Sequence, residues 1–193
     1  MKIRENNGEK VLVAMDFRNV NKPLCEAAGN ARKDYSALLD AVINGRECVA
    51  AFAYDSLIRD GVHDTCQHTH DMLREAGFTV RMSEAPSRND KQGHVDVFMA
   101  LDVYRYVVSN HIDVVELITG DSDFIPLMKM LQDLGVRVRI SSFRKTLAPI
   151  YQTYADDIRY LDSVPMIEME PVMISVEDDV SEGDVSLGEE ATV

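Results

Sequence analysis

The stretch Val114-Val115-Glu116-Leu117-Ile118-Thr119-Gly120-Asp121-Ser122-Asp123-Phe124-Ile125-Pro126-Leu127 decides the predicted fold. Its run of Val, Leu and Ile is typical of a strand that is buried on both faces of a parallel sheet. Gly120 then permits a sharp turn without a side-chain clash. Pro126 is expected in the first turn of the helix that follows, where proline is tolerated. The stretch therefore predicts a buried strand, a turn that carries acids, and a helix.

The two aspartates of this turn have different predicted roles. If Asp123 caps the helix, Pro126 falls at the third helical position, so capping competes equally with metal binding at Asp123. Asp121 then has no capping role. It lies at the carboxyl end of a strand, where open α/β sheets bind their ligands. Asp121 is therefore the stronger site candidate.

Apolar and amphipathic segments alternate along the rest of the chain, with residues 17–20 read as a loop. Because strands that alternate with helices imply a parallel sheet with right-handed crossovers, we predict a three-layer α/β sandwich. The polar third strand and the alternating fifth strand are assigned to the edges, which gives the order 3-2-1-4-5. The predicted strands are residues 10–16, 48–54, 78–82, 114–118 and 136–140, and the helices are residues 35–43, 60–76, 94–109 and 147–154.

This strand order brings acids from distant parts of the chain to one place. Strands one and four become neighbours at the point where the winding reverses, and ligands bind at such a point. Asp16 and Asp121 should then lie side by side, and Asp96 should join them from the first turn of its helix. Asp96 could instead only favour the helix dipole. Asp102, more than a turn further along, is expected either to support the metal ligands from behind or to be a buried hydrogen-bonding group, rather than a direct ligand.

Carboxylates gathered in one cleft repel each other. Each pair at about 4 Å costs on the order of 4 kcal/mol at an effective dielectric constant near 20. Shared protons or cations must offset this cost, and oxygen ligands suit Mg²⁺ or Mn²⁺. Such an ion can activate water and bind a scissile phosphate. Arg18 and Lys91 are candidate phosphate contacts or merely solvated bases, and Asn19 could orient Asp16, touch a phosphate or simply form a turn.

Composition restricts the class of protein further. The 193 residues, 46% of them hydrophobic, suffice for one domain, and no apolar run reaches the roughly 20 residues of a membrane helix. Three cysteines without paired spacing favour reduced thiols in a cytoplasmic protein. Dinucleotide and P-loop motifs are absent, which argues against a nucleotide cofactor. His63, Cys66 and His70 could share a helical stripe, but a zinc site usually takes paired ligands from separate elements.

Three motifs, in matching order, resemble the NYN domain family, the LabA-like branch of the PIN-like nucleases. The match extends from about residue 11 to residue 162, and residues 147–161 resemble the closing helix and strand of the family. The resemblance implies a PIN-like sandwich, a site for Mg²⁺ or Mn²⁺, and ribonuclease activity. The motifs are Met15-Asp16-Phe17-Arg18-Asn19, Val95-Asp96-Val97-Phe98-Met99-Ala100-Leu101-Asp102 and Thr119-Gly120-Asp121-Ser122-Asp123-Phe124-Ile125-Pro126-Leu127.

By position, the resemblance assigns Asp16, Asp96, Asp121 and Asp123 to the metal and to catalysis. The candidate substrate contacts are Arg18, Asn19, Ser122 and Lys91. Phe17-Arg18 departs from the family pattern, where small residues are usual, and could narrow the mouth of the pocket. The sequence thus predicts a metal-dependent endoribonuclease that acts on single-stranded RNA. The alternative is a catalytically silent module that binds RNA or protein on the same fold.

The net charge of −13 is concentrated near the C-terminus. Residues 161–193 hold ten acids and no lysine or arginine, whereas residues 1–160 hold 23 acids and 20 bases. The near-neutral body neither excludes nor supports a nucleic-acid ligand. We expect residues 1–162 to form the NYN domain and residues 163–193 to form a disordered acidic tail. The tail could compete with RNA for basic groups, or dock on a protein partner or a second subunit.

Overall fold

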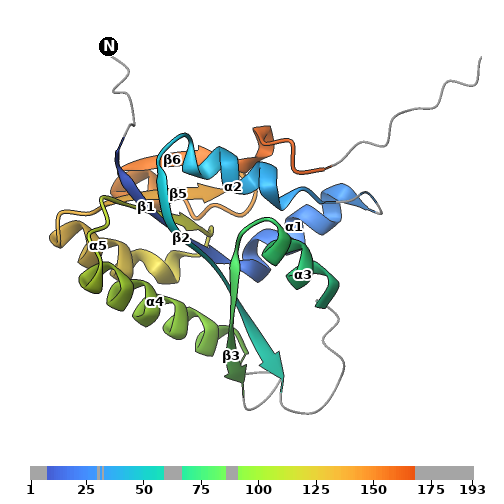
Figure 1. Cartoon of the computed structure of the whole chain (residues 1–193), viewed down its shortest axis with the longest axis horizontal. Coiled ribbons are helices and arrows are strands. Elements are labelled where there is room, and N and C mark those ends of the chain that lie inside the picture. The colour runs from blue at the N-terminus through green and yellow to red at the C-terminus, as the bar shows by residue number, and fades with distance from the viewer. Residues whose placement is uncertain (1–7, 30, 32, 59–66, 86–90, 168–193) are drawn as a thin grey trace, which may run out of the picture.

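The computed structural model describes residues 8–29, 31, 33–58, 67–85 and 91–167. Its six strands form one parallel sheet in the order β3-β2-β1-β4-β5-β6 (Figure 1). The strands are β1 (Lys10–Asp16), β2 (Glu47–Ile58), β3 (Thr79–Ala85), β4 (Val114–Ile118), β5 (Arg137–Ser142) and β6 (Asp157–Tyr160). The helices are α1 (Phe17–Ala28), α2 (Tyr35–Ile43), α3 (Gln67–Glu75), α4 (Lys91–Ser109), α5 (Ile125–Asp133), α6 (Tyr151–Tyr154) and the short 3-10 helices η1 (Ser122–Phe124) and η2 (Leu161–Ser163).

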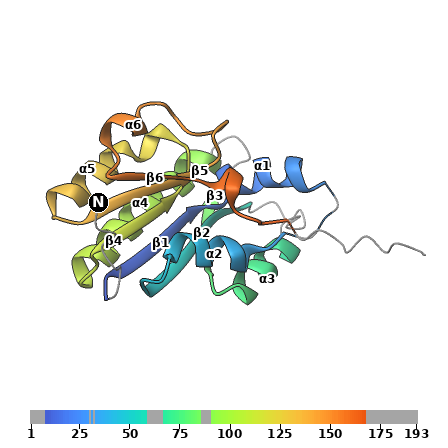
Figure 2. The same cartoon turned by 90° about the horizontal axis from the view of Figure 1, so that it is seen from above.

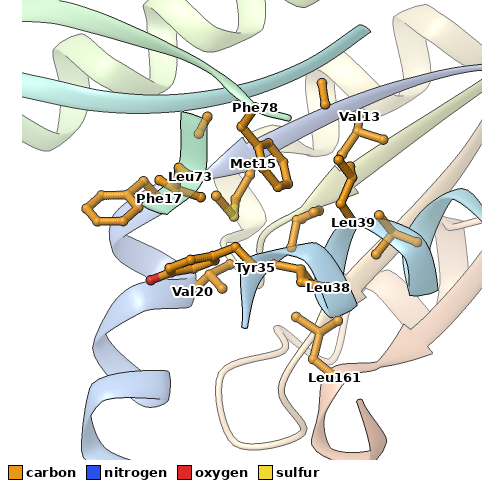
Figure 3. Close-up of a cluster of buried hydrophobic side chains, with 14 of the residues drawn as sticks. Val13, Met15, Phe17, Val20, Tyr35, Leu38, Leu39, Leu73, Phe78 and Leu161 are labelled. Carbon is orange, nitrogen blue, oxygen red and sulfur yellow. The ribbon is translucent and has the colours of Figure 1, made fainter. Parts of the chain in front are cut away.

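Helices cover both faces of the sheet, which confirms the predicted three-layer sandwich. Successive side chains of a strand point to opposite faces, and β1 is buried on both of them. Val13 and Met15 pack with the buried side chains of α1, α2 and α3 (Figure 3). Leu12 and Ala14 pack on the other face, with α4 and α5. Figure 1 shows these two groups of helices on opposite sides of the strands.

The order of the first five strands is the order predicted from burial patterning. β1 is parallel to β2 on one side and to β4 on the other, with Met15 opposite Ile118. β1 therefore lies next to β4 at the centre of the sheet, where the winding reverses. The carboxyl ends of β1 and β4 meet at one edge, which is the expected place for a ligand site.

The prediction that the fifth strand is an edge is wrong, because β6 pairs with it in parallel (Figure 2). β6 is short and polar and gives no pattern of its own in the sequence. The alternation in β5 has two causes. Arg137 is 51% exposed, as an edge position would be. Arg139 is only 15% exposed, and its Nε lies 3.8 Å from the buried Glu116 and 2.8 Å from the exposed Asp157, so charged neighbours account for this second polar position.

Several helix boundaries differ from those predicted. Residues 17–20 belong to α1, which starts directly after β1, and are not a loop. α4 begins at Lys91 instead of residue 94, so Asp96 lies in its second turn and not in its first. The last predicted helix shortens to the four residues of α6. Residues 60–66, predicted as the start of the third helix, lie outside the described part of the chain.

The chain after β6 folds back onto the domain. Met166 is 2% exposed and packs in the same cluster as Leu161, and its carbonyl accepts a hydrogen bond from the backbone N–H of Asp34 (2.7 Å). Packing against the domain thus continues at least to Ile167, which bridges to Lys33. The predicted acidic tail beyond residue 167 lies outside the described residues. Among the helices that the structure describes, none has the length and apolar character needed to cross a bilayer.

Candidate active site

Asp16 and Asp121 are joined at the carboxyl edge of the sheet by Thr119. The Thr119 hydroxyl donates a hydrogen bond to Oδ2 of Asp16 (3.3 Å) and accepts one from the backbone N–H of Asp121 (3.1 Å). Thr119 is 0% exposed and Asp16 only 4% exposed. A threonine at the end of β4 therefore holds the end of β1 and the start of the acidic turn in one arrangement.

Three carboxylates from two elements lie close together at this edge. Asp96 comes from α4, whereas Asp121 and Asp123 come from the turn at η1. Each offers one oxygen atom, and these oxygens lie within 4.8 Å of one another. Asp96 and Asp121 are half-buried, and Asp123 is exposed, so the cluster opens to solvent on one side. Asp16 is adjacent to these three residues but is not among them.

Burial and like charges raise the pKa values of two of these acids. Burial raises the pKa of Asp16 to about 6, and Asp121 and Asp55 add to the effect, although hydrogen bonds from Asn19 and Thr119 oppose it. Burial also raises the pKa of Asp96 to about 7, reinforced by the charges of Asp16, Asp121 and Asp123. The ionised cluster is therefore unfavourable, and a bound cation would relieve the repulsion.

The roles predicted for Asp121 and Asp123 at the helix start are reversed. Asp121 is the cap, since its Oδ1 accepts a hydrogen bond from the backbone N–H of Asp123 (3.0 Å). Asp123 lies in the first turn of η1, and Phe124 is the N-cap residue of α5, which begins at Ile125 and has Pro126 at its second position. The roles are reversed because a 3-10 turn separates the strand from α5. The prediction located the cap by counting back from Pro126 along one continuous helix.

Asp16 is also a cap, although the sequence suggested no such role for it. Its Oδ1 accepts a hydrogen bond from the backbone N–H of Asn19 (3.3 Å) at the start of α1. A carboxylate has about four acceptor positions, so a capping aspartate retains acceptor capacity for another ligand. Capping fixes the orientation of both Asp16 and Asp121, and this orientation is compatible with a metal-binding role.

Tyr151 is a site residue that sequence reasoning missed. Its hydroxyl donates a hydrogen bond to the backbone carbonyl of Asp121, and its side chain is fully buried. Burial, followed by the charges of Asp121, Asp16 and Asp123, raises the pKa of Tyr151, so it remains a proton donor. No motif marks it, because it lies in a four-residue helix 30 positions after Asp121 and reaches the site only in the folded chain.

Two of the predicted substrate contacts are held by other protein groups. The side-chain oxygen of Asn19 accepts a hydrogen bond from the backbone N–H of Gly120 (2.8 Å), so Asn19 ties α1 to the acidic turn. The Nε of Arg18 donates to Oδ1 of Asp55 (2.6 Å). Ser122 is exposed on η1. The side chain of Lys91 lies outside the described part of the structure, as do His63 and Cys66.

Asp102 is a buried hydrogen-bonding group, as expected, and it lies apart from the three clustered carboxylates. It is 5% exposed and accepts hydrogen bonds from the hydroxyl of Tyr54 (2.8 Å), from Arg81 and from Arg105 (2.9 Å). These partners outweigh the cost of burial and hold the pKa of Asp102 below its usual value. Its negative charge is already compensated, and so Asp102 supports the fold.

A parallel sheet in this order, with acids at the carboxyl ends of β1 and β4, is consistent with a PIN-like α/β sandwich. The family model described as NYN domain matches residues 10–162. The chain therefore belongs to the NYN family, which is part of the PIN-like nuclease superfamily.

Individual relatives support the fold and leave the activity open. An uncharacterized protein of Methanocaldococcus jannaschii is 27% identical over 137 residues, which are 69% of this chain and 51% of the relative. The chain thus spans about half the length of that relative. The crystal structure of a protein of unknown function from Vibrio parahaemolyticus superposes with a TM-score of 0.66 at 26% identity, covering 84% of this chain and 98% of that one.

Proposed function

We propose that the chain is a divalent-metal-dependent endoribonuclease that hydrolyses phosphodiester bonds in single-stranded RNA. The observation that carries the proposal is the convergence of Asp96, Asp121 and Asp123, whose oxygens lie within 4.8 Å of one another. Membership of a PIN-like nuclease family supports RNA as the substrate class. The alternative is a catalytically silent module that binds RNA or protein, and the near-neutral charge of residues 1–160 favours it.

The described residues fit Mg²⁺ or Mn²⁺ better than a softer metal. The three clustered ligands are all carboxylates, and hard cations prefer oxygen. Asp96, Asp121 and Asp123 would hold the ion, with Asp16 next to them. A divalent cation bound there would supply a Lewis acid that activates water and stabilises charge on the phosphate.

The protein's own contribution is to hold the acids in fixed positions. The backbone of Asp121 is held through its N–H by Thr119 and through its carbonyl by Tyr151. Asn19 anchors Gly120, the residue immediately before it. Ligands that are fixed by surrounding hydrogen bonds lose little freedom when a substrate binds. This arrangement supports a preorganised site in which the acids need not move to receive an ion and a phosphodiester.

Metal removal tests the proposal directly. Chain treated with a chelator and dialysed is expected to lose all cleavage of a circular single-stranded RNA, and added Mn²⁺ should restore it. A circular substrate has no ends, so any cutting is endonucleolytic. Electrophoresis detects the linear product. If calorimetry shows that Mn²⁺ binds but the RNA stays intact, the silent-module alternative is favoured; if no Mn²⁺ binds, the metal site itself is wrong.

The affinity for Mn²⁺ is expected to depend on pH. Asp96 and Asp16, with pKa values of about 7 and about 6, hold protons that a cation must displace. Protonation grows as pH falls, so affinity should be about tenfold or more weaker at pH 6 than at pH 8. Calorimetry in buffers of different ionisation enthalpy measures both the affinity and the protons released. In Asp96→Asn the affinity should vary less with pH, and a wild-type affinity that is constant from pH 6 to pH 8 would contradict the site.

A further inference from the structure

A cavity of about 480 Å³ adjoins the candidate active site between α1 and the segment that joins β5 to α6. We call it the α1 cavity. Its polar lining comes from Arg18, Asn19, Lys22, Glu26, Lys145 and Thr146. Lys22 and Lys145 belong to no motif that sequence reasoning singled out. The cavity is therefore a feature that only the folded chain reveals.

The α1 cavity is positively charged in a protein that is otherwise acidic. Arg18, Lys22 and Glu26 follow each other at intervals of four residues, so they lie along one face of α1. Lys145 faces them from the opposite wall and pairs with Glu26 (2.6 Å). Three bases thus meet one acid, whereas residues 1–160 as a whole carry 23 acids and 20 bases.

The pair between Glu26 and Lys145 is easily exchanged for another anion. Both side chains are more than half exposed, at 54% and 57% of their area. Exposed pairs of this kind contribute little to stability, since water and salt screen them. Lys145 nevertheless lowers the pKa of Glu26, which keeps that carboxylate ionised. In the free protein, Glu26 therefore pairs with Lys145, and a phosphate group could displace Glu26 from this lysine.

Arg18 is already oriented in the wall of the α1 cavity. Its Nε donates to Asp55, whose other oxygen lies 2.9 Å from Nε2 of His70. Asp55 and His70 are each 1% exposed, so the anchor is rigid, while 48% of the Arg18 side chain remains accessible. A guanidinium held through Nε still has its terminal N–H groups, whose fork geometry matches a phosphate.

The α1 cavity adjoins the acidic cluster at Gly120. Asn19 and Thr146 line the cavity. The side chain of Asn19 accepts a hydrogen bond from the Gly120 N–H (2.8 Å). The Gly120 carbonyl accepts one from the N–H of Ala148, two residues after Thr146 (2.9 Å). Asp121 is the next residue in the chain. A bound polymer that extends from the cavity past Gly120 therefore reaches the carboxylates of Asp96, Asp121 and Asp123.

We infer that the α1 cavity binds the sugar-phosphate backbone of the RNA next to the bond that is cleaved. The inference rests on the proposed function and assigns a path to the substrate. An extended polyanion fits better than a single small anion, because Lys22 and Lys145 are exposed and each contributes only weakly. Several phosphates together gain affinity through the release of counterions.

Removing the two lysines tests this path. RNA binding is measured by fluorescence anisotropy with a labelled oligouridylate and Mg²⁺, in an Asp121→Asn background that prevents cutting. Lys22→Ala/Lys145→Ala should weaken binding at least about tenfold, and the slope of log affinity against log salt should become shallower by roughly 1.4, the value for two lost phosphate contacts on a single strand. The matched control is Lys10→Ala/Lys129→Ala, which removes two exposed lysines elsewhere; its affinity should change less than twofold.

Glu26 provides a test of opposite sign. Glu26→Gln frees Lys145, so binding of the oligouridylate should become about twofold to threefold tighter. Glu75→Gln removes the same charge from an exposed position on α3 and should leave the affinity unchanged. A gain that is equal in both variants would mean that only the net charge matters, and it would overturn the assignment of the α1 cavity.

Other outcomes separate the path from the activity. If the wild type and Lys22→Ala/Lys145→Ala bind oligouridylate and cut RNA equally well, the path is wrong and the ribonuclease proposal stands. Chain that binds Mn²⁺ but no oligonucleotide would overturn both. If inorganic phosphate displaces the RNA when its concentration equals that of the RNA phosphate groups, the cavity is a small-anion site instead. A synthetic acidic peptide that binds the cavity more tightly than the RNA would indicate a protein ligand, and either of these last results rejects the inference.

Discussion

Asp121→Asn is expected to lower RNA cleavage at least about a hundredfold, because even residues one step removed from a metal usually cost 10-fold to 100-fold when changed. Asparagine retains the oxygen that caps η1, so the hydrogen bond from the Asp123 N–H should survive. The substitution removes one negative charge from the three clustered carboxylates. Single-turnover cleavage in Mn²⁺ measures the loss, and calorimetry should show weaker Mn²⁺ binding.

The matched control for this experiment is Asp133→Asn. Asp133 is exposed at the end of α5, and its replacement makes the same change in net charge away from the clustered acids. Cleavage by this control should equal that of the wild type. Urea unfolding of both variants tests the fold. Activity that survives Asp121→Asn undiminished would point to a contaminating enzyme, whereas a large loss of stability would assign Asp121 a structural role.

Burial patterning was sufficient to predict how the sheet places the two central strands. β1 is apolar from Val11 to Met15 and β4 is apolar apart from Glu116, so they were assigned to the inside of the sheet, and the polar β3 was assigned to an edge. Parallel connections of one handedness then make β1 and β4 neighbours. The meeting of Asp16 and Asp121 at one edge follows from these two constraints, and it requires no knowledge of side-chain positions.

Details at the ends of elements were not predictable in this way. The capping roles of Asp16 and Asp121 depend on where α1 starts and on the 3-10 turn before α5. A shift of one or two residues in a helix start changes which side chain is the cap, and sequence patterns do not locate helix ends so closely. The misplaced start of α4 is the same kind of error, and it put Asp96 one turn too early.

Contacts between distant segments were the hardest feature to predict from the sequence. Tyr151 binds the carbonyl of Asp121, and Lys145 faces Lys22 across the α1 cavity, but none of these residues has a neighbour in sequence that reveals its partner. Burial patterning missed β6, and only the family resemblance implied it, because Asp157–Tyr160 is a strand only by virtue of pairing with β5. The sequence thus indicated the acids of the site, whereas the groups that position them became visible only in three dimensions.

Gly120 was predicted to let the backbone turn without a side-chain clash, and the structure shows which atoms a side chain would meet. Gly120 does not adopt a positive φ, so backbone conformation is not what requires glycine there. Its lack of a side chain matters because the backbone is crowded. A Cβ atom at this position would lie 2.2 Å from the carbonyl oxygen of Thr146 and 2.7 Å from Oγ of Ser142. Glycine is required for close approach between the acidic turn and the segment after β5.

Gly120→Ala is therefore expected to destabilise the fold by about 3 kcal/mol or more, at the upper end of the cost of overpacking. The clash is with backbone, so the Thr146 segment itself must move. That movement would strain the hydrogen bonds of Gly120 with Asn19 and Ala148, and it would displace Asp121 and the wall of the α1 cavity together. Urea unfolding measures the stability, while Mn²⁺ and oligouridylate binding to the folded fraction should both weaken.

Gly135→Ala separates crowding from backbone strain in this experiment. Gly135 has a φ of +82°, but a Cβ atom added there would have no other group within 4 Å, so alanine meets strain without a clash. The expected cost is about 1 kcal/mol, with both binding activities retained. If Gly120→Ala costs no more than Gly135→Ala, the backbone of the Thr146 segment must yield freely. The acids would then not be held as rigidly as their hydrogen bonds imply, and the tight packing at Gly120 could not be what fixes the site.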